Sequence, residues 1–304
     1  MTQYYIDENN TKKEKKKKTG PTGLLSIILI ALAVTFLGDI IGILPVIGLS
    51  ALTDDGGWRF VLDSYFPFLG SFILMLVYMA NWDRELYVTA LPASRGGLKG
   101  NTVKWLLLGL LFGFVINGFC ALIAYLHGDL KFSVGSFDVI YMAVALILVG
   151  IQSSTEELIF RCYVFQAVRR RYGLAMGVVV NSVFFALMHG ANPGIGPLPI
   201  LDLLLWGVFC SLIVHYFDGF WFVCMVHTAW NYTQNFLLGL PNSGLVSERS
   251  FLHLEAAKGS IFYDFDFGIE GGLTSVLEQA ILIALILLWA KKSRQAAADD
   301  SGIR

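Results

Sequence analysis

The sequence predicts an all-α protein, a polytopic bundle of about eight transmembrane helices. Of its 304 residues, 56% are hydrophobic and only 15% are charged. Soluble domains average about 45–50% apolar and about 25% charged residues, so this composition indicates a lipid environment. The net charge of −1 carries no argument for a nucleic-acid partner, and none is expected.

Apolar runs recur along the whole chain and are long enough to cross a bilayer. A helix needs about 20 residues to span a hydrocarbon core of about 30 Å, because each residue advances about 1.5 Å. The expected spans are 24–49, 64–81, 104–126, 136–153, 173–190, 197–217, 219–239 and 272–290. The least defined boundary is at 153–171, which either extends the fourth span or forms a separate helix at the membrane edge.

Lysine and arginine clusters orient this bundle. Cytoplasmic segments carry an excess of positive charge, and the lysine-rich stretch 12–18 therefore places the N-terminus in the cytoplasm. An even number of spans returns the C-terminus to the same side. Three further clusters agree with this orientation: Arg84, Arg95, Lys99 and Lys104; Arg169, Arg170 and Arg171; Lys291, Lys292 and Arg294. We expect a multi-pass plasma-membrane protein with both termini cytoplasmic.

One bundle domain is expected over residues 23–292. A disordered basic tail, 1–22, precedes it, and a second cytoplasmic tail, 293–304, follows it. The exterior loop from about 240 to 271 mixes acidic, hydroxyl and aromatic side chains. It either caps a cavity or lies along the lipid headgroups.

A first cluster of polar residues interrupts the apolar sequence in the run SSTEELIFR, residues 153–161. Glu157 and Arg161 are four residues apart, so they can form an ion pair on one helix face. Glu156 is rotated from its neighbour by about 100° and can face a cavity as a general base. The alternative is a helix N-terminus, because a hydroxyl residue followed by glutamates is also a capping signature.

Two further spans carry polar residues at helical spacing. Phe185 and His189 occur in FALMH, and His227 and Asn231 occur in HTAWN. Taken singly, His189 is an interfacial cap, and His227 and Asn231 bridge neighbouring helices. Taken together with the glutamates and the arginine, the set fits amide hydrolysis: a carboxylate with one imidazole activates water, and a second imidazole and an amide stabilise the oxyanion.

These three motifs resemble those of a known family. EELIFR fits an EExxxR pattern, FALMH fits FxxxH and HTAWN fits HxxxN. Their order and separation resemble the CAAX-protease and bacteriocin-processing family of intramembrane endopeptidases, also called the CPBP or Abi family. The matching core covers residues 136–239. The resemblance implies a helical membrane protease with its active site between helices.

The resemblance also implies a role for each matching residue. Glu156 would activate the water with help from His189, and His227 and Asn231 would form the oxyanion site. The supporting residues would be Glu157 and Arg161, which orient the motif helix, with Arg161 also meeting substrate, and Phe185, which shapes the cavity wall.

The metal requirement is open in the resemblance, because the family is described both as metal-dependent and as glutamate-dependent. Glu156, His189 and His227 would be the ligands of a zinc ion, whose usual donors they supply. The HExxH helix of many zinc proteases is absent from the sequence. We expect a glutamic mechanism with no required cofactor, and zinc is the alternative.

The expected activity is cleavage of a peptide bond in a membrane-associated or prenylated protein or peptide. Two alternatives use the same polar residues. One is a non-catalytic scaffold or bacteriocin-immunity protein that binds a partner in the cavity. The other is a proton-coupled transporter with Glu156 and Asp39 as protonation sites, against which the absence of an internal sequence repeat argues.

Overall fold

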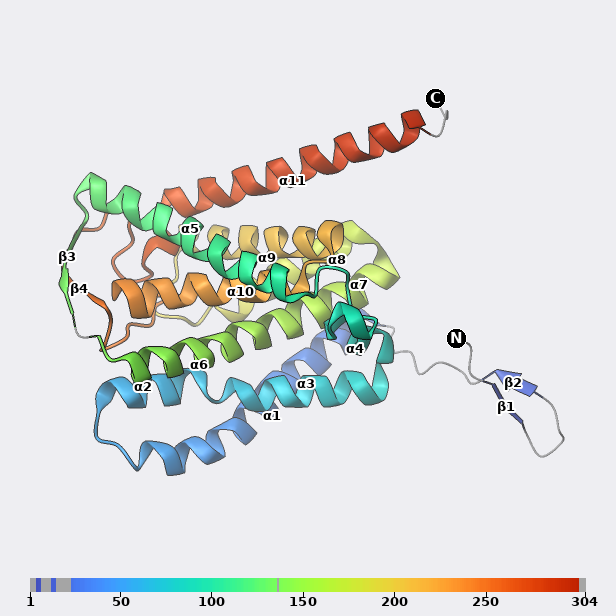
Figure 1. The fold of residues 1–304 in the computed structure, drawn as a ribbon, viewed down its shortest axis with the longest axis horizontal. Helices are drawn as coiled ribbons and strands as arrows, with labels where there is room; N and C mark the ends of the chain where they lie inside the picture. The colour runs from blue at the N-terminus through green and yellow to red at the C-terminus, as the bar shows by residue number, and fades with distance from the viewer. Residues whose placement is uncertain (1–3, 7–11, 15–22, 136, 301–304) are drawn as a thin grey trace.

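The computed structural model describes residues 4–6, 12–14, 23–135 and 137–300. Its helices run roughly along one direction and form a bundle (Figure 1). They are α1 (Leu24–Ser50), α2 (Gly56–Tyr65), α3 (Phe68–Trp82), α4 (Arg84–Ala90), α5 (Val103–His127), α6 (Val139–Glu157), α7 (Phe165–Tyr172), α8 (Leu174–Met188), α9 (Pro197–Phe217), α10 (Phe220–Tyr232) and α11 (Leu273–Asp300). Two π-helical segments, Leu158–Val164 and Thr233–Leu238, continue α6 and α10.

Six helices in the described part of the chain are long and apolar enough to cross a membrane. They are Leu24–Ser50, Gly56–Trp82, Val103–His127, Val139–Tyr172, Pro197–Phe217 and Leu273–Ala296. They indicate an integral membrane protein, and the predicted all-helical fold is confirmed. The predicted count of about eight spans is not confirmed. The two remaining expected spans are helical, but α8 has only 15 residues, and α10 carries several polar side chains.

The uncertain boundary at 153–171 lies inside one helix. α6, the π-helical segment and α7 join without a break into a 34-residue helix, Val139–Tyr172. This stretch is therefore an extension of the fourth span and not a separate helix. A π-helical turn widens a helix locally and often occurs at functional sites; here it begins one residue after Glu157.

Glycines let neighbouring helices of the bundle approach closely. The buried residues of α1 recur at helical spacing and include Gly38 and Gly42. A Cβ at Gly42 would lie 2.0 Å from the carbonyl oxygen of Pro67, just before α3. A Cβ at Gly113 of α5 would lie 2.5 Å from the carbonyl oxygen of Val226 in α10. Small residues at such contacts allow the backbone-to-backbone packing that stabilises membrane helices.

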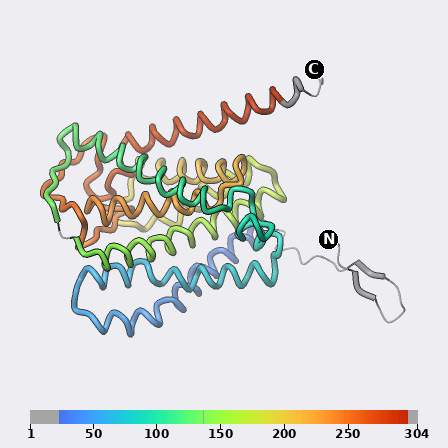
Figure 2. Tube along the Cα trace, viewed as in Figure 1, coloured from blue at the N-terminus to red at the C-terminus, as the bar shows by residue number. Residues whose placement is uncertain are grey.

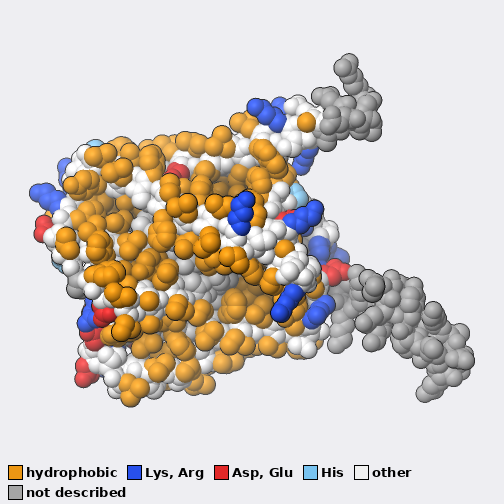
Figure 3. Space-filling model, viewed as in Figure 1, with side chains coloured by type: hydrophobic (Ala, Val, Ile, Leu, Met, Phe, Trp, Pro, Cys, Tyr) orange, Lys and Arg blue, Asp and Glu red, His pale blue; other side chains and the backbone are white. Residues whose placement is uncertain are grey.

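The two ends of the bundle differ in character. α1 begins and α11 runs towards the end at which α4 and α7 lie, as the chain trace shows (Figure 2). Most of the lysine and arginine side chains visible in the space-filling view gather at that end, and hydrophobic side chains cover most of the visible side (Figure 3). The cytoplasmic orientation of the basic end stays a prediction.

Short strands occur outside the bundle helices. β3 (Leu130–Val134) pairs with β4 (Leu252–Ala257) in an antiparallel sheet at the end opposite α4 (Figure 1). In the predicted N-terminal tail, β1 (Tyr4–Ile6) pairs with β2 (Lys12–Glu14), and the rest of 1–22 lies outside the described residues. α11 continues to Asp300, beyond the expected start of the C-terminal tail at 293, and residues 301–304 lie outside the described part.

Candidate catalytic site

A polar cavity of about 270 Å³ lies within the bundle. Its wall includes all four residues predicted to be catalytic: Glu156 from α6, His189 at the end of α8, and His227 and Asn231 from α10. The fold thus brings together side chains that are up to 75 positions apart in the sequence. Their catalytic roles stay a prediction, and their spatial convergence is observed.

The carboxylate of Glu156 faces two imidazoles. Its Oε2 atom lies 3.7 Å from Nε2 of His227 and 4.0 Å from Nε2 of His189. Its other oxygen, Oε1, accepts a hydrogen bond of 2.6 Å from Nε2 of Gln152. Because the distances to the imidazoles exceed those of direct hydrogen bonds, a small bridging group such as water fits the arrangement.

The neighbours of the two histidines determine their tautomers. Nδ1 of His189 lies 2.9 Å from the carbonyl oxygen of Phe185, and a carbonyl oxygen only accepts hydrogen bonds. Nδ1 of His227 lies 2.9 Å from Oε1 of Glu157, a carboxylate that also contacts an arginine. In the neutral ring each Nδ1 therefore carries the hydrogen, and each Nε2 presents a lone pair towards Glu156.

Glu157 and Arg161 form the predicted ion pair. Nε of Arg161 lies 3.1 Å from Oε2 of Glu157, and both side chains are completely buried. The guanidinium also lies on the ring of Phe185, with 4.2 Å between Cζ and the ring centroid. The two adjacent glutamates thus occupy different environments: Glu157 is enclosed with a cation, and Glu156 reaches the cavity.

The capping alternative for the two glutamates does not hold. A cap would place them at a helix N-terminus, but both lie inside the continuous helix Val139–Tyr172. His189, in contrast, does end α8, at its C-terminal cap position. It is therefore a helix cap and also part of the cavity wall, and its position relative to the membrane interface stays a prediction.

Phe185 lies behind the histidines. Its side chain is almost completely buried, and its ring centroid lies 4.6 Å from that of His189 and 6.4 Å from that of His227. It therefore supports both imidazoles and the arginine from within the protein. The sequence interpretation of Phe185 as a residue that shapes the cavity is a proposal that this packing supports.

The amide of Asn231 is held by protein groups. Its Nδ2 donates to Oε1 of Gln152 at 3.2 Å and to Oγ of Ser153 at 3.4 Å. Its Oδ1 accepts from Nδ2 of Asn242, also at 3.2 Å. An oxyanion that used this amide as a donor would have to replace one of the two bonds from Nδ2.

Sequence reasoning missed several members of this site. Gln152 could have been predicted, because it precedes Glu156 by four residues and therefore lies on the same helix face. Asn242 and Glu270 lie on the loop after α10, where no periodicity indicates which side chains point inwards. This loop caps the cavity through Asn242, Ser243 and Leu245, so one of the two alternatives for the loop is confirmed for this stretch.

Two single acidic residues of the spans have different surroundings. Asp39 of α1 lines the same cavity as Glu156 and accepts a hydrogen bond of 2.7 Å from Oγ of Ser71. Glu278 of α11 accepts a hydrogen bond from Sγ of Cys120 at 3.3 Å and does not line that cavity.

The donor set of Glu156, His189 and His227 consists of groups that zinc accepts. Among the residues that the structure describes, no three side chains of His, Cys, Asp or Glu lie in an arrangement that could hold a metal ion. The metal requirement therefore stays a prediction from the sequence.

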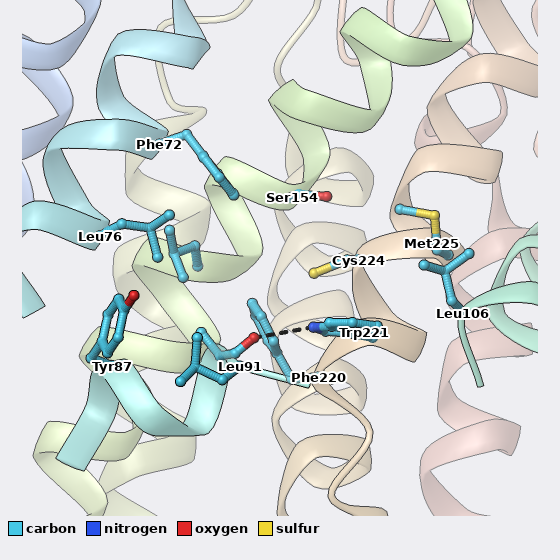
Figure 4. A pocket seen from close by; sticks show the side chains of 12 residues that line it. Phe72, Leu76, Tyr87, Leu91, Leu106, Ser154, Phe220, Trp221, Cys224 and Met225 are labelled. Atoms are coloured by element: carbon cyan, nitrogen blue, oxygen red, sulfur yellow. Dashed lines mark hydrogen bonds between the residues drawn. The ribbon is translucent and has the colours of Figure 1, made fainter. Parts of the chain in front are cut away.

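A second cavity, of about 340 Å³, lies on the other side of α6 (Figure 4). Ser154 and Leu158 line it, about 160–200° around the helix from Glu156. The other lining side chains are mostly apolar, and the indole N–H of Trp221 donates to the carbonyl oxygen of Ala90 at 3.1 Å. Since its wall contains no ionisable carboxylate or imidazole, the polar cavity is the better candidate for catalysis.

Residues 135–233 match a family model described as Rce1-like, type II CAAX prenyl endopeptidase. The matched segment contains the three sequence motifs and all seven predicted site residues. It agrees with the family resemblance predicted from those motifs and confirms it. A search of curated proteins finds no match.

Proposed function

Because residues 135–233 match a CAAX-protease family model, we propose that the chain is an intramembrane endopeptidase in which Glu156 activates the attacking water. The observation that carries this proposal is the convergence of Glu156 Oε2 with Nε2 of both His189 and His227 in one cavity. A carboxylate that can take a proton beside two oriented imidazoles is suited to water activation.

In the proposed reaction, Glu156 takes a proton from a water molecule held between it and the imidazoles. The water oxygen bonds to the scissile carbonyl carbon, and the carbonyl electron pair moves to its oxygen. The tetrahedral intermediate then collapses, the C–N bond breaks, and the leaving nitrogen takes the proton that Glu156 carried. The products are a carboxylic acid and an amine, which exchange a proton to become a carboxylate and an ammonium ion, so the residues return to their starting state.

The developing oxyanion needs hydrogen-bond donors. Nδ1 of His227 is held by Glu157, so this ring would donate to the oxyanion from Nε2 when both of its nitrogens carry hydrogen. Nδ2 of Asn231 is the second proposed donor. His189, held by the carbonyl of Phe185, would orient the water.

The proposed substrate is a peptide segment of a membrane-associated or prenylated protein. The cavity lies among membrane-spanning helices, and amide side chains from Asn192, Asn231 and Asn242 line it. Such amides can both donate to and accept from a peptide backbone. A bilayer-anchored substrate would reach the cavity without leaving the membrane.

The test compares purified wild-type protein with Glu156→Gln in lipid nanodiscs, on prenylated and unprenylated peptides. Glu255→Gln is the matched control, because Glu255 is exposed on β4. We expect cleavage by the wild type and the control and none by Glu156→Gln. Cleavage by Glu156→Gln at the wild-type rate would overturn the mechanism. Peptide binding without cleavage by all three proteins would instead support the scaffold alternative.

A further inference from the structure

Glu270 is a buried carboxylate outside the segment that matches the family. It lies in the short 3-10 helix Ile269–Gly271, just before α11. Its Oε1 atom accepts hydrogen bonds from Nε1 of Trp230 at 2.7 Å, from Nε2 of Gln234 at 3.0 Å and from Nδ2 of Asn242 at 2.9 Å. Its Oε2 atom accepts from the backbone N–H and the hydroxyl of Ser243, at 2.8 and 2.9 Å. Every one of these partners is a donor, which suits a carboxylate.

Three amide side chains connect this carboxylate with Glu156. Nδ2 of Asn242 donates to Glu270 and also to Oδ1 of Asn231, at 2.9 and 3.2 Å. Nδ2 of Asn231 donates to Oε1 of Gln152 at 3.2 Å. Nε2 of Gln152 donates to Oε1 of Glu156 at 2.6 Å. The chain of contacts thus runs from one carboxylate to the other without a break.

The charge on Glu270 determines the direction of every amide in this chain. A carboxylate only accepts, so Asn242 must present its NH₂ group to it. The same NH₂ group also faces Asn231, which must therefore present its oxygen. Asn231 then presents its NH₂ group to the oxygen of Gln152, and Gln152 presents its NH₂ group to Glu156. A reversal anywhere would set two oxygens or two NH₂ groups against each other.

We propose that Glu270 is a positioning residue for the peptidase reaction: through Asn242, Asn231 and Gln152 it fixes the amide that holds Glu156. This inference rests on the proposed function for its catalytic meaning. Glu270 lines a small cavity together with His189 and His227, but its hydrogen bonds to the amides are the contacts that connect it with Glu156. The catalytic carboxylate is thereby oriented from a loop that lies outside the three motifs.

Replacing Glu270 by Gln keeps the size of the side chain but removes the constraint. A glutamine has one acceptor oxygen in place of two, so its NH₂ group would face either the donors of Trp230 and Gln234 or the backbone N–H of Ser243. Asn242 could then turn, and Gln152 could present its oxygen to the carboxylate of Glu156. We expect kcat to fall about 10- to 100-fold with KM nearly unchanged, the size found when a group that orients an active-site residue is lost.

The experiment is a double-mutant cycle between Glu270→Gln and Gln152→Ala, with kcat and KM measured for all four proteins. If Glu270 acts through the amides, its replacement lowers kcat in the Gln152 protein and has little further effect in the Gln152→Ala protein. If each substitution lowers kcat by the same factor whether or not the other is present, the proposal is overturned. Glu278→Gln is the matched control, since Glu278 bonds Cys120 and lies outside the chain of amides.

The same cycle separates this proposal from the proposed function. Thermal unfolding midpoints in detergent need no substrate, and they are measured for the same four proteins. Glu270 and Gln152 lie at opposite ends of this series of hydrogen bonds. If their two substitutions change the unfolding midpoint non-additively, the connection between them is supported even if the wild type cleaves nothing. Additive changes in the midpoints together with multiplicative changes in kcat reject the role of Glu270 and leave the role of Glu156 untouched. If the Glu270→Gln protein does not fold, Asn242→Ala replaces it in the cycle, because Asn242 is the amide that contacts Glu270. Its effects on kcat and on the midpoint should then also be non-additive with those of Gln152→Ala.

Discussion

Glu157 holds His227 by a contact of 2.9 Å between Oε1 and Nδ1, and the opposite nitrogen of the ring faces Glu156 at 3.7 Å. The imidazole thus lies between two adjacent glutamates of one helix. This is possible because the glutamates point about 100° apart around the helix axis. Glu157 therefore sets the tautomer of the ring that the other glutamate faces.

Glu157→Gln should abolish most activity with little change in the geometry of the cavity. The amide removes the carboxylate that accepts from Nδ1 of a doubly protonated His227 ring, the form whose Nε2–H is the proposed oxyanion donor. It also leaves Arg161 with no carboxylate partner in the ion pair. We expect kcat/KM to fall about 10²- to 10⁴-fold, as in other sites where a carboxylate orients a histidine.

The measurement is steady-state cleavage by Glu157→Gln beside the Glu255→Gln control. Near-ultraviolet circular dichroism of both proteins reports whether the tertiary packing is preserved. Full activity in a correctly folded Glu157→Gln protein would show that the contact with His227 has no catalytic importance.

Arg161→Ala should destabilise the fold itself. The change leaves the fully buried carboxylate of Glu157 without its cation and removes the guanidinium from the ring of Phe185. Breaking one partner of a buried pair costs about 3–5 kcal/mol. Arg171, exposed on α7, is the matched control, and Arg171→Ala should change the unfolding free energy by less than about 0.5 kcal/mol.

Reversible unfolding in mixed micelles would measure both free energies. The double variant Glu157→Ala/Arg161→Ala should lose less than the sum of the two single changes, because it leaves no unpaired charge. A strictly additive loss would mean that the two side chains do not depend on each other.

The sequence predicted the parts of the site that have helical spacing. Glu157 and Arg161 are four residues apart on one helix, and their ion pair is observed. His189 and His227 were assigned to one cavity because their motifs resemble a family, and both line it. Periodicity is a property of single helices, however, so it could not show that Gln152 bonds Asn231 across two helices.

The loop residues of the site and the number of spans could not be predicted from the sequence, for other physical reasons. Glu270 follows Asn231 by 39 residues and reaches the site through a loop whose path depends on tertiary contacts. The span count depends on where each helix ends and how apolar it is. α8 ends at Met188 after 15 residues, whereas the apolar pattern extended the expected span from 173 to 190.

Metal chelation separates the two mechanisms that the family resemblance leaves open. The favoured glutamic mechanism predicts that dialysis against a chelator leaves kcat/KM unchanged within about twofold, because Glu156 needs no metal to accept a proton. A zinc mechanism predicts loss of activity and recovery on addition of zinc, since the metal would generate the nucleophile. Elemental analysis of the purified protein, beside a His189→Ala/His227→Ala double variant, shows whether bound zinc depends on the histidines.

Helix α1 provides a stability prediction with a control in the same helix. Gly42→Ala would place a Cβ 2.0 Å from the carbonyl oxygen of Pro67, a backbone atom that cannot move alone, whereas a Cβ at Gly48 meets nothing within 4 Å. Overpacking of this kind costs about 1–3 kcal/mol, so Gly42→Ala should lower the unfolding free energy by about that amount. Gly48→Ala should be neutral or slightly stabilising, because alanine favours a helix over glycine by about 1 kcal/mol.

The displaced helix should also affect catalysis. α1 carries Asp39 to the wall of the catalytic cavity, and its backbone meets α3 at Gly38, where a Cβ would lie 2.3 Å from Cα of Ser71. A shift of α1 caused by Gly42→Ala would move Asp39 relative to Glu156, so KM should rise in this variant and stay unchanged in Gly48→Ala. Equal unfolding midpoints and equal KM values for the two variants would show that α1 and α3 do not pack at these glycines.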